Sequence, residues 1–372
     1  MAETTTGILK RVRKLQFVIR TADRSYRPGP VEVMVHQDLS RRFALTEGAV
    51  VTGQVEREKG NLRLVSIESI GGMPPESFRE RSHFTDLVAI DPHERFDLGA
   101  CGQDSMRITD LIAPIGKGTR QLIVSPPKAG KTILLEQTVQ AIRQCSPESR
   151  IIVLLIDERP EEVTHFRRAV EGAEVVANTS DHSADEHVEL TELMLAHVQI
   201  ELECGREVVL LIDSLTRLAR AFNSRARQRG VPRGHTMSGG LEAGILEVPR
   251  RLFGLARNIE NGGSITIIAT CLIKTGSRMD ELIFEEFKGT GNSEIVLDRS
   301  LAEARIFPAI NIPASGTRKE AKLYNQDHSR GLATLRRVLS NYRTREAMDS
   351  LFKLLKQYPT NREFLESMCS GS

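Results

Sequence analysis

Tryptophan is absent from this 372-residue sequence, and aromatic residues make up only 5% of it. The five cysteines are an odd number with no C-x-x-C spacing, which argues against a disulfide framework and against a zinc site. The first residues lack a signal-peptide core, and no stretch approaches the roughly 18 apolar residues of a membrane span. These absences predict a cytoplasmic protein with reduced thiols and no membrane partner.

A large net charge is also lacking. Lys and Arg number 51 against 49 Asp and Glu, so the net charge of +2 points to no class of partner. The content of 40% hydrophobic and 27% charged residues is ordinary for a soluble globular protein, and the length allows two domains. The excess of basic over acidic residues is larger between residues 1 and 70 than over the whole chain, which is compatible with nucleic-acid binding without establishing it.

Residues 1–70 have the pattern of a small all-β domain. Short alternating runs are separated by turn sequences such as Arg-Pro-Gly-Pro at 27–30. The expected strands are Leu15–Arg20, Val31–Val35, Val50–Val55 and Leu62–Ile67. Their near-regular spacing predicts an OB or cold-shock-like barrel.

The rest of the chain has a different pattern. Residues 71–100 are charged and irregular, which is typical of a connector. Within residues 101–372, buried-strand runs alternate with helical segments, and a helical segment at 331–368 closes the chain. The strand runs are Leu122–Val124, Ile151–Ile156, Val208–Ile212 and Ile265–Ala269. This alternation predicts an α/β fold with a doubly wound, mainly parallel sheet.

Residues 121–136 join an apolar run, a Pro-Pro turn, a Gly-Lys-Thr triplet and an apolar helical pattern. This order is typical of a P-loop, where backbone N–H groups and a helix N-terminus surround phosphates. Lys131 would reach the β- and γ-phosphates, and the Thr132 hydroxyl would hold Mg²⁺. Ser125 stands where the usual G-x-x-x-x-G-K-[ST] pattern has its first glycine. The alternative is a strand-turn-helix whose lysine is merely solvated.

Two other apolar runs end in acidic residues. Residues 208–213 have the form of a Walker B strand ending in Asp213, and residues 151–158 end in Asp157 and Glu158. Because the carboxyl ends of parallel strands meet at the ligand edge of such a sheet, Asp213 is expected beside Mg²⁺ and Glu158 beside the attacking water. The alternative for each is a helix-capping or loop carboxylate, which the P-loop makes less favoured.

The segment Asp181–His187 superficially resembles a metal cluster. Its spacing fits no zinc motif, whereas Ser183 or Asp185 before an apolar helical run is good N-cap chemistry. We therefore expect a helix start there.

Several of these segments together resemble the Rho family of transcription termination factors. They are the segments 125–132, 154–164, 213–221, 287–292 and 305–320. The resemblance implies a homohexameric, RecA-like, RNA-dependent ATPase that translocates along RNA as a 5′–3′ helicase and dislodges RNA polymerase. RNA, RNA polymerase, ATP and Mg²⁺ are the implied partners and cofactors.

The resemblance also implies roles for single residues. Arg318 would be an arginine finger that reaches a neighbouring subunit's site, Phe307 would pack on the adenine, and Lys131, Glu158 and Asp213 would be catalytic. The implied nucleotide contacts are Gly116, Lys117, Gly118, Thr119, Arg120, Gln121, Lys128, Ala129, Gly130, Lys131, Thr132, Ile133 and Arg159. The implied RNA contacts are Phe17, Arg20, Met34 and Arg63 in the barrel and His235, Thr236, Met237, Arg278 and Lys288 in two pore loops.

This chain departs from that family in its RNA-facing segments. Leu15–Val18 and Met34 stand where such barrels carry aromatic residues, so base stacking and pyrimidine preference should be weak. The approach to the first pore loop instead holds four arginines. These residues, Arg225, Arg227, Arg229 and Arg233, are expected either to neutralise RNA phosphates or to pair with acidic residues of a neighbouring subunit.

Two other functions fit parts of the sequence. One is a Rho-like RNA-binding regulator with a weakened RNA site, which loss of Lys131, Glu158 or Arg318 would signal; all three are present. The other is an export or rotary ring ATPase, but such proteins keep the first glycine of the loop and a Gly-Glu-Arg context for the catalytic glutamate.

Overall fold

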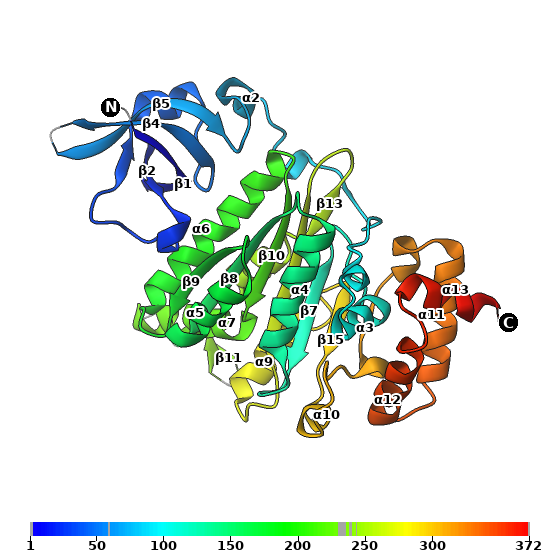
Figure 1. Cartoon of the computed structure of the whole chain (residues 1–372). Coiled ribbons are helices and arrows are strands. Elements are labelled where there is room, and N and C mark those ends of the chain that lie inside the picture. Colours follow the sequence, from blue (N-terminus) through cyan, green and yellow to red (C-terminus); the bar gives the residue numbers. More distant parts are fainter. Residues whose placement is uncertain (1–2, 59, 230–235, 238–239, 243, 371–372) are drawn as a thin grey trace.

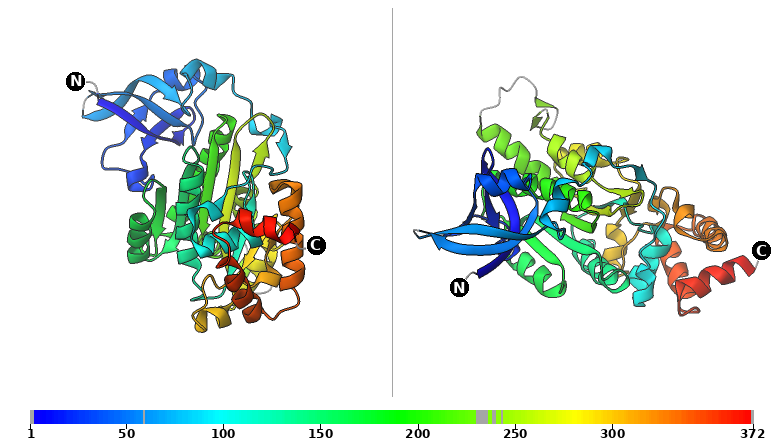
Figure 2. Two further views of the ribbon diagram at one scale, coloured as in Figure 1. Left: turned by 45° about the vertical axis from the view of Figure 1, so that its right-hand side comes forward. Right: turned by 90° about the horizontal axis from the view of Figure 1, so that it is seen from above.

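The structure, a computed structural model, describes residues 3–58, 60–229, 236–237, 240–242 and 244–370. A small barrel and a group of C-terminal helices lie at opposite ends of a central sheet (Figures 1 and 2). Among the described residues, no helix combines the length and apolar character needed to cross a bilayer.

The N-terminal strands form a closed barrel in the order β1-β2-β3-β5-β4. The strands are β1 (Glu3–Arg13), β2 (Gln16–Arg20), β3 (Val33–Val35), β4 (Val50–Glu58) and β5 (Asn61–Ile70), and a short helix α1 (Gln37–Arg42) follows β3. The expected barrel is confirmed, and its four expected strands correspond to β2 to β5. Strand β1 was not expected from the sequence. It pairs with both β2 and β4 and closes the barrel.

The α/β part is built on a nine-stranded sheet whose main path is β16-β15-β7-β14-β10-β8-β9. The six strands from β15 to β9 are parallel to their neighbours, as expected for a doubly wound sheet, whereas β16 joins antiparallel at one edge. The bounds are β7 (Arg120–Ser125), β8 (Arg150–Glu158), β9 (Glu174–Thr179), β10 (Glu207–Asp213), β14 (Ser264–Leu272), β15 (Ser293–Val296) and β16 (Gly316–Thr317).

The region expected to be a connector also adds to this sheet. It contains α2 (Pro75–Arg79) and β6 (Ala89–Ile90), and β6 pairs with β13 (Arg257–Ile259) beside β14. Residues 71–100 are therefore more than a linker.

Helices cover both faces of the sheet because strand side chains alternate between two cores. On β8, Ile151, Val153 and Leu155 face one core, and Ile152, Leu154 and Ile156 face the other. The first core is closed by α3 (Asp104–Ile112), α4 (Lys131–Cys145), α5 (Pro160–Ala169), α10 (Arg299–Glu303), α11 (Gln326–Leu339), α12 (Thr344–Leu355) and α13 (Asn361–Ser370). The second is closed by α6 (Ala184–Glu203), α7 (Leu215–Gln228), α8 (Glu247–Phe253) and α9 (Arg278–Phe287).

The barrel is anchored on α6 and on the edge strand β9. Tyr26 is buried and its hydroxyl donates to Glu174, at the start of β9. Ser25 Oγ accepts from the backbone N–H of Ala177 at 3.0 Å, which occupies a donor on the sheet edge. His197 of α6 is fully buried and donates from Nδ1 to the carbonyl oxygen of Gly48 at 2.8 Å. The barrel and the α/β part therefore share buried polar contacts rather than only a tether.

Gly48→Ala tests this anchoring. Gly48 has a φ of 88°, and a Cβ there would lie 2.5 Å from backbone atoms of Ala196 and His197. We expect a loss of about 2–4 kcal/mol in unfolding free energy, combining a strained backbone with overpacking. Urea unfolding measures it. Gly60→Ala is the matched control, because Gly60 has a φ of 86° with nothing within 4 Å of its Cβ position. Equal losses in the two variants would mean that the contact with α6 adds nothing.

Candidate active site

The P-loop connects β7 to α4 at the carboxyl edge of the sheet. β7 ends at Ser125, and α4 begins at Lys131 with Gly130 as its N-cap. Lys128 and Gly130 have φ values of 63° and 85°, so the turn contains two residues with a left-handed backbone, one of them a glycine. The turn leads into the N-terminus of a fifteen-residue helix, which is the arrangement that binds phosphate.

Lys131 and Asp213 meet at this edge. The Lys131 ammonium forms an ion pair with Asp213 Oδ1 at the end of β10. Thr270 Oγ1, from the neighbouring strand β14, donates to the same Asp213 oxygen at 2.7 Å and holds the carboxylate in place. Thr132 follows Lys131 in the first turn of α4. The sequence reasoning did not identify Thr270, because its role depends on the pairing of β14 with β10.

Glu158 ends β8 beside these residues and is buried. Arg217 of α7 forms an ion pair with Glu158 Oε2 at 3.1 Å and also donates to the carbonyl oxygen of Asp157. Burial, followed by the charge of Asp213, raises the pKa of Glu158 to about 8 although Lys131 and Arg217 oppose the shift. The surroundings therefore favour proton binding at the carboxyl expected to position the attacking water.

The raised pKa of Glu158 has a consequence for activity. An acid with a pKa near 8 is protonated below that pH, and only its ionised form accepts a proton. We expect kcat/KM for ATP to rise about tenfold per pH unit between pH 6 and 7.5 and to level off above pH 8, because kcat/KM reports the pKa of the free enzyme. A steady-state pH profile at fixed ionic strength checks this. A flat profile from pH 6 to 9 would show that Glu158 ionisation does not limit the reaction.

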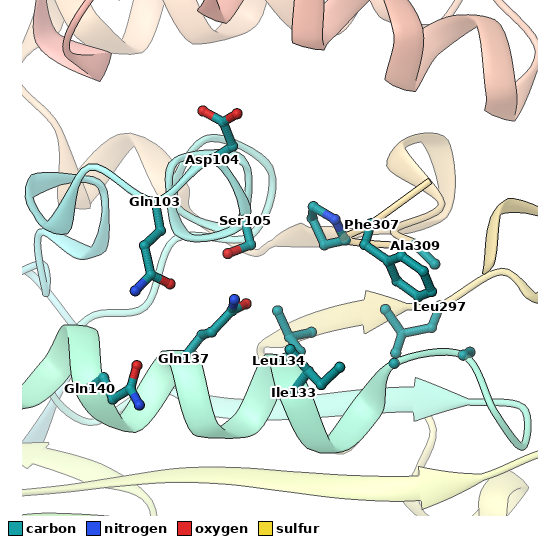
Figure 3. Close-up of a pocket in the computed structure, with 13 residues that line it drawn as sticks. Gln103, Asp104, Ser105, Ile133, Leu134, Gln137, Gln140, Leu297, Phe307 and Ala309 are labelled. Carbon is teal, nitrogen blue, oxygen red and sulfur yellow. The ribbon is translucent and has the colours of Figure 1, made fainter. Parts of the chain in front are cut away.

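A pocket of about 450 Å³ lies beside the P-loop (Figure 3). Ala129, Gly130 and Ile133 line it together with Phe307, which is 45% exposed and whose ring lies against Gly130. Four of the residues expected to bind nucleotide therefore meet here. Arg159, the N-cap of α5, is exposed directly after Glu158.

Residues 116–121 lie away from this pocket. Arg120 starts β7 and the P-loop follows its last residue, so about 17 Å of strand separates them. Lys117 is ion-paired with Glu207 at 2.7 Å and Glu94 at 2.9 Å. The expected contact of this segment with nucleotide therefore stays a prediction, and it does not involve the pocket beside the P-loop of the same chain.

Arg120 and Arg318 are instead neighbours at the amino end of β7. The backbone N–H of Arg120 donates to Asn292 Oδ1 at 2.8 Å, and that of Arg318 donates to the Asn292 carbonyl oxygen at 2.7 Å. Arg318 is exposed, and its charge, after burial, lowers the pKa of Arg120. Two cations with no ion pair among the described residues thus lie at this surface.

The barrel residues expected to bind RNA separate into three environments. Phe17 is 1% exposed in the barrel core, beneath the guanidinium of Arg11, so its ring offers no face for a base; this expectation was wrong. Arg20 is ion-paired with Glu32 at 3.1 Å. Met34 and Arg63 lie opposite each other on β3 and β5 and line a hollow of about 280 Å³.

Helix α7 connects the catalytic edge to both segments expected to line the pore. Its first turn carries Arg217, and Asn223 further along donates to the Gly240 carbonyl oxygen at 3.1 Å. Arg220 forms two hydrogen bonds with the buried Asp280, at the start of α9. Thr236 and Met237 form the short strand β11, Arg278 starts α9 exposed, and Lys288 is ion-paired with Glu285 at 3.4 Å. His235 lies outside the described residues.

The segment at 181–187 starts α6, as expected. Ser183 is the N-cap and forms a capping box with Glu186. Its side-chain oxygen accepts from the backbone N–H of Glu186 at 3.3 Å, and the Glu186 carboxylate accepts from the backbone N–H of Ser183 at 2.8 Å. The helix-start interpretation is confirmed.

Two family models match the chain. The model for the Rho termination factor RNA-binding domain matches residues 5–76, and that for the nucleotide-binding domain of the ATP synthase alpha/beta family matches residues 105–317. A prototypical ATPase from the type III secretion system of pathogenic bacteria has a similar structure, with a TM-score of 0.63 over 85% of this chain and 93% of that one. At 24% identity this similarity concerns the fold alone.

Curated relatives are much more similar in sequence. Transcription termination factor Rho of Cereibacter sphaeroides is 45% identical over 97% of this chain and 86% of its own length. The Rho proteins of Pseudomonas aeruginosa and Aquifex aeolicus are 44% and 45% identical, each over 97% of this chain and 87% and 84% of their own lengths. Lys131, Asp213 and Glu158 meet at one sheet edge, and the barrel that precedes them in the chain matches the RNA-binding model. On these similarities, this chain belongs to the transcription termination factor Rho family.

Proposed function

We propose that this chain is an RNA-dependent ATP hydrolase that promotes transcription termination by releasing nascent RNA from RNA polymerase. The observation that carries this proposal is the meeting of Lys131, Asp213 and Glu158 around one P-loop in a member of the Rho family. The export and rotary alternatives are supported by a similar fold and by the domain model matched at residues 105–317, whereas the relatives that match 97% of this chain at about 45% identity are Rho proteins. In this proposal the protein acts in the cytoplasm.

ATP would lie along α4, with its adenine against Phe307 and its phosphates over residues 128–133. Thr132 and Asp213 would hold Mg²⁺, and they fit this role because both offer oxygen ligands and Asp213 is paired with Lys131, the residue before Thr132. Mg²⁺ would neutralise charge on the phosphates. Lys131 would move from Asp213 to the phosphates, because the carboxylate is its only ion-pair partner among the described residues.

Glu158 would position the attacking water and accept its proton, and Arg217 would orient the Glu158 carboxylate. Arg159 would contact the phosphates from the adjacent N-cap. Bound nucleotide and Mg²⁺ bring charge close to Glu158, so its ionisation would be coupled to binding.

A second copy of the chain would complete the site. Arg318 and Arg120, at the amino end of β7, would face the phosphates held by the neighbouring copy in a ring, which we propose to be a homohexamer. In this arrangement residues 116–121 act between subunits rather than within one.

RNA would contact two regions in the proposed translocating ring. In the barrel, Met34 and Arg63 in their hollow would take the place of stacking aromatics, and Arg20 would act from its edge. In the pore, His235, Thr236 and Met237 would form one loop, and Arg278 with Lys288 the other.

Measuring ATP hydrolysis by the purified chain with and without single-stranded RNA tests the function. We expect stimulation by RNA that differs little between poly(C) and poly(A), because no Phe, Tyr or Trp lines the hollow. Hydrolysis without any response to RNA would favour another ring ATPase. RNA binding without hydrolysis would favour a regulatory protein.

A further inference from the structure

The arginines that precede the first pore loop are not free cations in the structure. Arg225 and Arg227 lie in the last turn of α7, and Arg229 is its C-cap. Arg225 and Arg229 are both ion-paired with Asp185, and Arg225 also with Glu192. Neither phosphate nor a neighbouring subunit is required for these pairs, so the sequence reasoning missed an internal partner. Arg233 lies outside the described residues.

These contacts define an arginine clasp, consisting of Arg225, Arg229, Asp185 and Glu192. The acidic residues come from the first turns of α6, which packs beside α7 (Figure 1). Asp185 Oδ1 lies 2.9 Å from Arg225 Nε and 2.9 Å from an Arg229 guanidinium nitrogen, so one oxygen serves two cations. The Glu192 contact is longer, at 3.4 Å.

Breaking the ion pairs of the arginine clasp should cost little free energy. The side chains of Asp185 and Arg229 are 49% and 59% exposed and that of Arg225 is 19% exposed, so the pair of Arg229 with Asp185 in particular contributes little to stability. A guanidinium has five N–H donors in a planar fork, which a phosphate engages in bidentate fashion. A single shared carboxylate oxygen does not use that capacity, which a phosphate would use more fully.

The position of the clasp connects it to the catalytic edge. The same helix carries Arg217 against Glu158 at its start and Asn223 against Gly240 before its last turn. A ligand that draws Arg225 and Arg229 away from α6 would therefore act on the end of α7 that contacts Gly240, next to β12 (Leu241–Glu242).

We propose that the arginine clasp is an RNA phosphate-binding site whose own carboxylates, Asp185 and Glu192, occupy it until RNA displaces them. The proposal rests on the proposed RNA-dependent function. It differs from both interpretations drawn from the sequence. The arginines would bind phosphate only when the phosphate displaces the carboxylates of the same chain. RNA that binds at the pore approach would therefore first have to break the ion pairs of the clasp in each subunit.

Removing the competitor tests the proposal directly. Asp185→Asn keeps the side-chain shape and leaves both arginines in place. We expect single-stranded RNA to bind about threefold to tenfold more tightly, the size expected when one or two exposed ion pairs no longer compete. Fluorescence anisotropy with a labelled homopolymer measures this affinity. The matched control is Glu189→Gln, an equal charge change at an exposed position of α6 outside the clasp, which should change affinity less than twofold.

Removing the arginines gives the second arm. The double variant with Arg225→Gln and Arg229→Gln should lower the slope of log K against log salt by about 1.4, since each phosphate contact on a single strand contributes about 0.7. Unchanged affinity in Asp185→Asn, or an unchanged slope in the double variant, would overturn the proposal. Weakened ring assembly with an unchanged slope would instead assign the arginines to a subunit contact.

These outcomes are separable from those of the proposed function. RNA-stimulated hydrolysis is measured for the unsubstituted chain in the same buffers. If stimulation is present while both arms fail, the clasp proposal alone is wrong. If RNA does not stimulate hydrolysis by the unsubstituted chain, the proposed function is wrong, and with it the clasp proposal that rests on it. Thermal unfolding of each variant excludes a folding defect as the cause.

Discussion

Glu158→Gln should reduce the turnover of ATP by about 10²- to 10⁴-fold, the range that a positioned general base contributes. The reason is chemical rather than structural: glutamine occupies the same space and keeps hydrogen-bonding capacity, but it cannot accept the proton of the attacking water. Because burial and Asp213 raise the pKa of Glu158 to about 8, the site already disfavours a negative charge here and should tolerate a neutral amide. The fold and nucleotide affinity should therefore survive.

Single-turnover hydrolysis and equilibrium binding of ATP separate these effects. We expect the dissociation constant to change by less than about threefold while the chemical step slows, which is the pattern of an interaction made in the transition state. Glu161→Gln is the control, because Glu161 is an exposed acid on the first turn of α5. Near-normal turnover in Glu158→Gln would remove this residue from the mechanism.

The fold was largely predictable because its central strands are long apolar runs. β8 and β10 carry buried residues on both faces, which is the signature of a parallel sheet covered by helices. β1 gave no such signal. Of its eleven residues only Gly7, Ile8 and Leu9 are buried, so most of the strand is polar and its pairing is determined by neighbours distant in sequence.

The catalytic acids were predictable for a related reason. Strand ends converge at one sheet edge, so Asp213 and Glu158 could be placed from sequence alone. Arg217, Arg220 and Asn223 could not, because each acts through a partner on another element that only the packing of α7 brings into contact. The arginine clasp was missed for the same reason.

The expectation for Phe17 failed for an identifiable physical reason, whereas the nucleotide contact of residues 116–121 stays a prediction. Alternation along β2 places Phe17 inward, and a barrel this small needs that ring in its core. The resemblance that assigned residues 116–121 to the nucleotide gave no information on which subunit supplies them. The length of β7 places them at the far end of the strand from the P-loop.

Arg318 lies near the amino end of β7, far from the P-loop of its own chain, so we expect it to act on the nucleotide of a neighbouring subunit. Arg318→Ala alone should lose about 10³- to 10⁵-fold in turnover, as expected for a missing arginine finger, and Lys131→Ala should be similarly inactive. The backbone N–H of Arg318 donates a hydrogen bond to Asn292 near the amino end of β7, whereas Lys131 lies beyond the carboxyl end of β7. One chain therefore cannot bring the two side chains to the same phosphate.

Mixing the two inactive proteins should restore hydrolysis. In a ring with head-to-tail interfaces, about a quarter of the junctions in an equimolar mixture pair an intact Lys131 with an intact Arg318. Activity should therefore appear on mixing and peak near equal proportions, measured by phosphate release after subunit exchange. Arg337→Ala, at an exposed position on α11, serves as a control for loss of a surface arginine. Native mass spectrometry establishes that mixed rings form. Mixed rings without any recovered activity would place Arg318 within its own chain or outside the reaction.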